Sequence, residues 1–256
     1  MSGRKCESKS MNAPAQNSEK TYWLKDPIWY APPSVIYHYG IHLDPLPPEQ
    51  KTSKAFKKAD ELLVAAIALL GIQLDETELY WMQPVSDSEG SPDVRTGRFL
   101  SPQGAHAPHF EYQDVELVAF VPQAGEDVAS FLSRTKLSKA KSYDDKTIIL
   151  CHMQKGASVP SVPAITEALR STGAVCPVIV MGRTHSGRKD YTLFQVHPQY
   201  KEIAAYNLDE ILKTQPRRSV LNLRRGSKPS NESRPNDEHC PFESMGFVCP
   251  LLKRTS

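Results

Sequence analysis

The second half of the chain alternates short apolar runs with helix-like segments, and this pattern constrains the fold most. Three runs, at 115–121, 147–153 and 178–181, are apolar on both faces. Apolar residues at helical spacing fill the gaps between them, at 126–135 and 161–171. Strands of this kind belong to sheets that helices cover on both sides. The pattern therefore predicts an α/β fold with a mixed, mostly parallel sheet.

The same periodicity places four more elements. Residues 54–70 form the clearest helix, and Gly71 follows at the position where glycine commonly ends one. Short strands are expected at 77–83 and 191–196, and a helix at 203–212. The strand at 191–196 follows its predecessor closely enough to form an antiparallel edge.

Composition divides the chain into four parts. Residues 1–20 are polar and aperiodic, which predicts disorder. Residues 21–49 hold six aromatic residues and six prolines, which predicts an extended arm that wraps the core, or alternatively an aromatic recognition surface. Residues 50–213 are expected to form the α/β domain, with a long loop at 84–108. Residues 214–256 are expected to be a disordered basic tail, so no regular structure is predicted after Thr214.

Positive charge is concentrated in that tail. The formal net charge is +2, whereas residues 213–228 carry six basic residues and no acid, so that the remaining residues sum to −4. A basic tail on a slightly acidic body indicates a polyanion, an acidic protein or a nuclear-import receptor as partner. The alternative is a linker whose charge only keeps it solvated.

Two short motifs lie in the basic segment. The spaced pairs Arg217, Arg218 and Arg224, Arg225 resemble a nuclear localisation signal. Ser227 lies three residues after an arginine and two before a proline, which resembles a kinase site. Its phosphorylation would reduce the local positive charge and create a docking site for an arginine-lined groove.

Cysteine usage indicates a reducing compartment, cytoplasmic or nuclear. The five cysteines are odd in number and form no C-x-x-C motif, and no apolar leader or membrane-spanning run is visible. Cys151 and Cys176 lie in apolar runs and are expected to be inert core thiols. Cys176, Cys240 and Cys249 each precede proline, which resembles a thiolate haem-binding dipeptide, but local turn chemistry is the favoured interpretation. No cofactor is predicted.

An anion site is expected beyond the carboxyl ends of the strands, where ligands bind in open α/β sheets. The loops after the three strands supply Lys155, Arg183, His185 and Arg188, with glycines that allow close backbone approach. Such groups suit a phosphate or a nucleic-acid backbone. Ordinary surface chemistry is the alternative, because no nucleotide-binding fingerprint is present.

Metal sites are weakly indicated. Asp114 and Glu116 lie on one face of a strand, as in a restriction-endonuclease-like site. Such a site also needs an acidic or amide residue two positions before Lys155, and Met153 stands there instead. His38 and His42 have ligand-like spacing, but Gly40 argues against their presentation on a helix. The cluster of His106, His109 and Glu111 is interrupted by Pro108. No metal is therefore predicted.

These observations favour an intracellular interaction or regulatory protein with a protein partner and no membrane association. It would act through its basic, phosphorylated tail. Two alternatives stay open. One is a ligand-binding protein or enzyme that uses the basic loops for a phosphate-bearing ligand, and the other is a nucleic-acid-binding protein.

Overall fold

The computed structural model describes residues 28–76, 79–85, 92–100, 109–121, 123–137, 143–153, 161–184, 189–215, 220–222 and 241–242. The strands are β1 (Ile28–Tyr30), β2 (Tyr80–Pro84), β3 (Val94–Leu100), β4 (His109–Phe120), β5 (Thr147–Met153), β6 (Val178–Arg183), β7 (Asp190–His197), β8 (Lys201–Asn207) and β9 (Val220–Asn222). The helices are α1 (Pro32–His42), α2 (Lys54–Glu76), α3 (Val128–Thr135), α4 (Val162–Arg170) and α5 (Leu208–Thr214), with one 3₁₀ turn at Gln50–Thr52.

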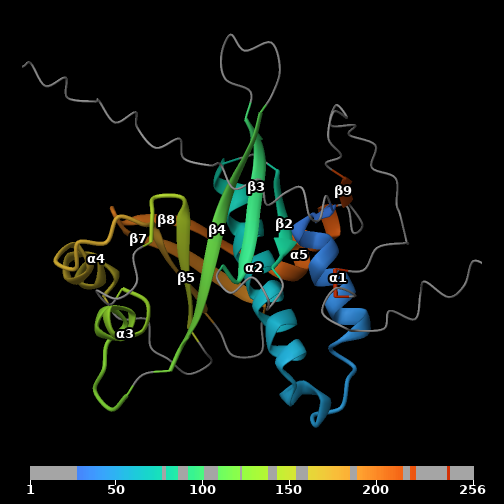
Figure 1. Ribbon diagram of the computed structural model, residues 1–256, viewed down its shortest axis with the longest axis horizontal. Helices are drawn as coiled ribbons and strands as arrows, with labels where there is room; N and C mark the ends of the chain where they lie inside the picture. The colour runs from blue at the N-terminus through green and yellow to red at the C-terminus, as the bar shows by residue number, and fades with distance from the viewer. Residues whose placement is uncertain are drawn as a thin grey trace, which may run out of the picture.

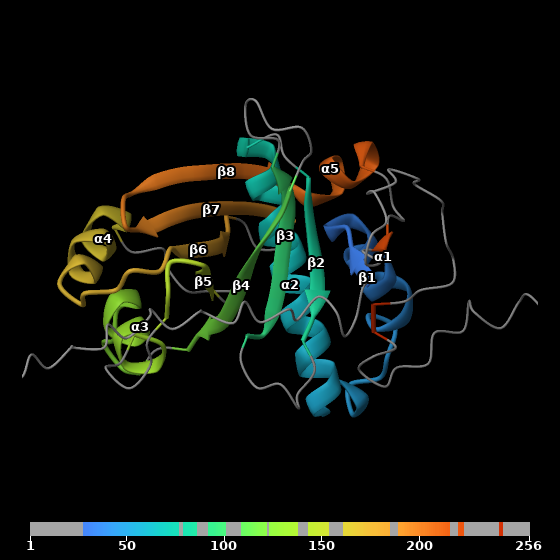
Figure 2. The same cartoon turned by 45° about the horizontal axis from the view of Figure 1, so that its top comes forward.

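These strands form one nine-stranded sheet in the order β8-β7-β6-β5-β4-β3-β2-β1-β9. Helix α2 lies behind the sheet in Figure 1, and α3 and α4 lie on its other side. The sheet is strongly twisted, so that β6, β7 and β8 run across the direction of β2, β3 and β4 (Figure 2). The predicted α/β class is confirmed.

The prediction of a mostly parallel sheet is wrong. Among the described strands, β4–β5 and β5–β6 are parallel, and the other neighbouring pairs are antiparallel. The reason lies in the connections. Only a connection long enough to hold a covering helix returns the chain for a parallel strand, and α3 and α4 are those helices.

Two apolar clusters occupy the two faces of the sheet. The larger lies between the sheet and helices α1 and α2, and includes Leu62, Leu70 and Leu193. The smaller lies under α3 and α4, and includes Phe131 and Leu169. Burial on both faces explains why β5 and β6 read as continuous apolar runs. In the described part of the chain, no helix is long and apolar enough to cross a membrane.

Helix α2 continues beyond its expected end. Gly71 lies inside the helix, which runs to Glu76. A Cβ atom at Gly71 would lie 2.7 Å from Cε1 of Tyr206 and 3.1 Å from Cδ2 of Leu193. Glycine is required here because β7 and β8 approach the helix closely, and not because the helix ends.

The expectation of an extended arm before residue 50 is wrong for residues 32–42, which form α1. Pro32 and Pro33 occupy the first helical turn, where proline costs no backbone hydrogen bond. The aromatic side chains of Trp29, Tyr30 and Tyr39 are buried, as a wrapping role predicts.

Four strands lie where none was expected, and one of them, β1, forms within the residues that were interpreted as an arm. Strand β3 forms within the predicted loop at 84–108, and β8 takes the first half of the predicted helix at 203–212. Regular structure also resumes after Thr214, because β9 pairs with β1 along three residues. Phe242 is fully buried in the larger cluster, with its ring 6.0 Å from that of Tyr39. The predicted domain boundaries stay predictions.

Candidate functional site

Arg183 is the one residue of the expected anion site within the described residues. It ends β6, and its Nε and Nη2 donate to the Tyr191 hydroxyl at 3.1 and 3.0 Å. The guanidinium also lies 5.3 Å from the centre of that ring. Lys155, His185 and Arg188 lie outside the described residues, so their convergence with Arg183 stays a prediction. Ser227 and Arg217, Arg218, Arg224 and Arg225 of the basic tail also lie outside them.

A second group of polar side chains lies near this edge, on the α2 side. The Tyr39 hydroxyl donates to Oδ1 of Asp60 at 3.2 Å. Burial lowers the pKa of His152 in β5, and Arg183 acts in the same direction, whereas Asp60 raises it. The net decrease favours the neutral imidazole at neutral pH.

A network of charges surrounds the start of β3, and we call it the charged junction. Asp93 precedes β3, and its Oδ2 accepts a hydrogen bond from the backbone N–H of Leu117 at 2.8 Å. Lys136, which follows α3, lies with its Nζ 2.7 Å from Glu116 and 3.9 Å from Asp93. Lys58 of α2 lies 3.6 Å from Asp93. The junction therefore links α2, α3 and β4 around Asp93.

Burial shifts the acid–base behaviour of the junction. The pKa of Glu61 in α2 is raised by burial and by the nearby charge of Asp93, although the neighbouring lysines act in the opposite direction. Burial and the charge of Glu116 raise the pKa of Tyr143 to about 12. Glu116 has only 6% of its side chain exposed, so its pairing with Lys136 offsets a large desolvation cost.

The two acids that were considered for a nuclease site, Asp114 and Glu116, each lie beside a basic side chain. Asp114 lies 3.7 Å from Arg95, and Glu116 is paired with Lys136 from α3. Met153 is buried, and Lys155 lies outside the described residues. Over the described ranges, no group of three His, Cys, Asp or Glu side chains is placed to hold a metal ion.

The structure contradicts one expectation about the histidines and agrees with the expectation about two cysteines. His38 and His42 are presented on a helix, contrary to expectation, with their rings stacked 5.6 Å apart. His106 and the side chain of His109 are not among the described parts. Cys151 and Cys176 are buried free thiols, and burial raises the pKa of Cys151 to about 12, which keeps the thiol protonated.

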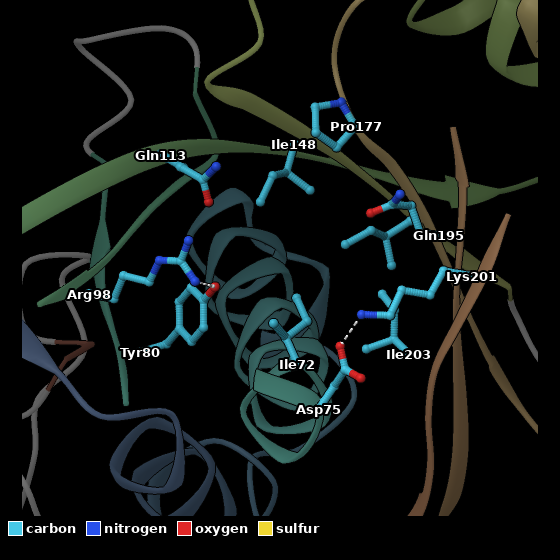
Figure 3. Close-up of a pocket in the computed structure, with 11 residues that line it drawn as sticks. Ile72, Asp75, Tyr80, Arg98, Gln113, Ile148, Pro177, Gln195, Lys201 and Ile203 are labelled. Atoms are coloured by element: carbon cyan, nitrogen blue, oxygen red, sulfur yellow. Dashed lines mark hydrogen bonds and ion pairs between the residues drawn. The ribbon is translucent and has the colours of Figure 1, made fainter. Parts of the chain in front are cut away.

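A cavity of about 130 Å³ lies between the end of α2 and the concave face of the sheet (Figure 3). We call it the α2 pocket. Each strand from β2 to β8 contributes to it, because the twisted sheet curls around this end of the helix. The lining residues are Ile72, Asp75, Tyr80, Arg98, Gln113, Ile148, Pro177, Ile179, Gln195, Lys201 and Ile203. The pocket lies at the amino ends of the parallel strands, opposite the edge where a ligand was expected.

The polar side chains of the pocket are held in place by their neighbours. Nη1 of Arg98 donates to the Tyr80 hydroxyl at 3.0 Å, and its Nε lies 3.4 Å from Glu111. On the opposite side, Nζ of Lys201 donates to Asp75 at 2.5 Å (Figure 3). Each cation of the lining therefore has an acid beside it, and the pocket is close to neutral.

Sequence reasoning missed the α2 pocket and the charged junction. Arg98 and Asp93 lie in the segment that was interpreted as a loop, and Lys201 lies just before a segment that was interpreted as a helix. One signal was available. Gln113 shares a face of β4 with the buried Val115 and Leu117, and a polar residue in such a register marks either a solvated edge or a lined cavity.

The chain matches no known protein family, no curated protein and no solved structure.

Proposed function

We propose that this protein binds a small polar ligand in the α2 pocket. The observation that carries the proposal is the composition of the pocket. Polar side chains, which make up about half of the lining, converge with apolar side chains from the helix and the sheet, and a small-molecule site combines these two kinds of group. The lining comes almost entirely from regular elements, so the pocket needs little rearrangement to accept a ligand.

The position of the pocket shapes this proposal. It replaces the predicted basic loops as the place of binding, and its near-neutral lining does not favour a dianionic phosphate inside the cavity. Lys201 has 54% of its side chain exposed and lies at the rim. The more polar part of the ligand therefore belongs at the mouth, beside the Lys201–Asp75 pair, with the less polar part inserted.

A ligand screen by thermal unfolding tests the proposal. A ligand that binds only the folded state at about 100 times its Kd stabilises it by about 2.7 kcal/mol. The panel should include nucleosides, nucleotides, amino acids and aromatic carboxylates. We expect at least one class to raise the Tm of the wild type, and Ile203→Trp, which fills the pocket, to abolish that increase.

The matched control is Val175→Trp, because Val175 is an exposed residue outside the pocket. This variant should keep the full ligand response. The proposal is wrong if no class stabilises the wild type, or if Ile203→Trp responds as the wild type does.

A regulatory role of the basic tail is a separate proposal. It is best tested by replacing Arg217, Arg218, Arg224 and Arg225 with serine in the full chain. Deletion of 214–256 would be ambiguous, because it also removes β9 and the buried Phe242. Loss of nuclear accumulation or of nucleic-acid binding with an unchanged Tm would support a role for the tail, whereas retention of both would exclude it. Localisation in the cytoplasm or the nucleus stays a prediction.

A further inference from the structure

We propose that the part of the ligand inserted into the α2 pocket is a single six-membered heterocycle of the pyrimidine-base type. This inference rests on the proposed function and specifies its ligand class. It is carried by three properties of the pocket, namely its volume, its walls and its two amide side chains.

The volume selects one ring. The cavity holds about 130 Å³, and an engineered cavity of ~150 Å³ in another protein accommodates benzene. One six-membered ring therefore fills the α2 pocket. The walls are firmly placed, since Ile148 and Ile179 belong to central strands and Ile72 to a buried helical turn, so a fused two-ring purine would extend beyond this space toward the mouth.

The walls suit a flat ring. Ile72 comes from α2 and Ile148 from β5 (Figure 3). Ile179 of the neighbouring strand β6 also lines the pocket. Aliphatic side chains from a helix and from a facing sheet provide two apolar surfaces. Proteins that bind an unstacked base hold its faces between apolar or aromatic side chains in this way.

The edge of the ring would be recognised by amides. Gln113 of β4 and Gln195 of β7 direct their amide groups toward the middle of the pocket from two sides (Figure 3). The amide nitrogen of Gln195 donates to the carbonyl oxygen of Gln199 at 3.2 Å, which fixes this side chain. An amide offers both donors and an acceptor, and the edge of a pyrimidine base presents the same mixture.

The charges around the pocket favour a neutral base over an aromatic carboxylate. The acids beside Arg98 and Lys201 leave no net positive charge inside the pocket to compensate a buried carboxylate. A neutral base has no such requirement. The sugar would extend toward the rim, where Lys201 is exposed.

Calorimetry with the full chain tests the inference. The probes are uridine, cytidine and their 5′-monophosphates, with adenosine, guanosine, benzamide and benzoate as comparisons. We expect a pyrimidine nucleoside to bind at least about 10-fold more tightly than any purine nucleoside or benzoate. Loss of a paired base contact weakens binding by about 5- to 150-fold, so Gln113→Met and Gln195→Met should each weaken pyrimidine binding in that range.

The control is Gln123→Met, an exposed glutamine outside the pocket, which should bind as the wild type does. Purines that bind as tightly as pyrimidines, or pyrimidine binding unchanged in both glutamine variants, would overturn the inference. If another class binds in a manner that Ile203→Trp abolishes while pyrimidines do not bind, the ligand class is wrong and the proposed pocket function stands. If nothing binds, both are wrong.

Discussion

The side chain of Lys136 contacts both Glu116 and Asp93 in the charged junction. Its side chain is 13% exposed and that of Glu116 is 6% exposed, so removal of the ammonium group would strand a buried carboxylate. We expect Lys136→Met to lower the free energy of unfolding by about 3–5 kcal/mol in urea denaturation. Lys189→Met, which breaks the exposed pair with Asp209, should cost no more than about 1 kcal/mol. Equal effects of the two variants would show that the junction carries no special stability.

Glu61 gives the junction a pH dependence. Its pKa is raised in the folded state above the ordinary value of 4.5, so folding favours the protonated carboxyl. The associated stability is present below the ordinary pKa and is lost as the pH rises through the folded pKa. We therefore expect Glu61→Gln to gain stability relative to the wild type between about pH 4 and about pH 7, as measured by urea unfolding. A stability difference between the variant and the wild type that is constant with pH, or that shrinks as the pH rises, would contradict the raised pKa of Glu61.

At the scale of elements, two glycines in helices should respond to alanine with opposite signs. Replacement of a helical glycine by alanine gains up to about 1 kcal/mol from helix propensity. At Gly40 of α1 the added Cβ meets nothing within 4 Å, so Gly40→Ala should raise the Tm. At Gly71 the Cβ meets Tyr206, whose hydroxyl is bonded to the carbonyl oxygen of Ile67 and whose ring cannot easily move.

Overpacking of this kind costs about 1–3 kcal/mol, which outweighs the propensity gain. Gly71→Ala should therefore lower stability by about 1 kcal/mol, measured alongside Gly40→Ala by thermal unfolding. Stabilisation by both substitutions would mean that β7 and β8 do not constrain α2 at this position.

The elements also show what a sequence can predict. Strand β5 was predicted at its observed bounds, because burial on both faces leaves a continuous apolar run. Helix α3 was recognisable from its apolar spacing, and Asp127 caps it by accepting from the N–H of Ser130. Strand β3 was missed because its apolar residues are interrupted by Arg95, Gly97 and Arg98, and each of these is explained only by a tertiary contact.

The α2 pocket was unpredictable for a related reason. Its lining is drawn from the helix and from seven strands, and no two of its polar groups share a local motif. The ligand site was expected at the carboxyl ends of the strands because of a rule for parallel sheets. This sheet is largely antiparallel, and the α2 pocket lies at the opposite ends of its parallel strands. Arg183 was predicted in the loop after a strand, whereas it is the last residue of β6 and its observed partner is Tyr191.

At the scale of the whole molecule, the segment after residue 214 contributes to the core. Phe242 is fully buried against Tyr39, so Phe242→Ala should lower the free energy of unfolding by about 3–5 kcal/mol. Leu79→Ala, at a residue that is 64% exposed, should change it little. Urea unfolding of both variants decides the matter, and a Phe242→Ala protein as stable as the wild type would show that its burial contributes nothing.

The return of the chain to its beginning has a consequence for biosynthesis. Strand β1 is held between β2 and β9, and Phe242 packs beside α1, so the elements at 28–42 are completed by residues that are synthesised much later. Domains generally fold from the N-terminus as they leave the ribosome. For this protein, the apolar surface around Tyr39 stays uncovered until translation has passed residue 242. A nascent chain stalled before that point would therefore expose this surface to chaperones.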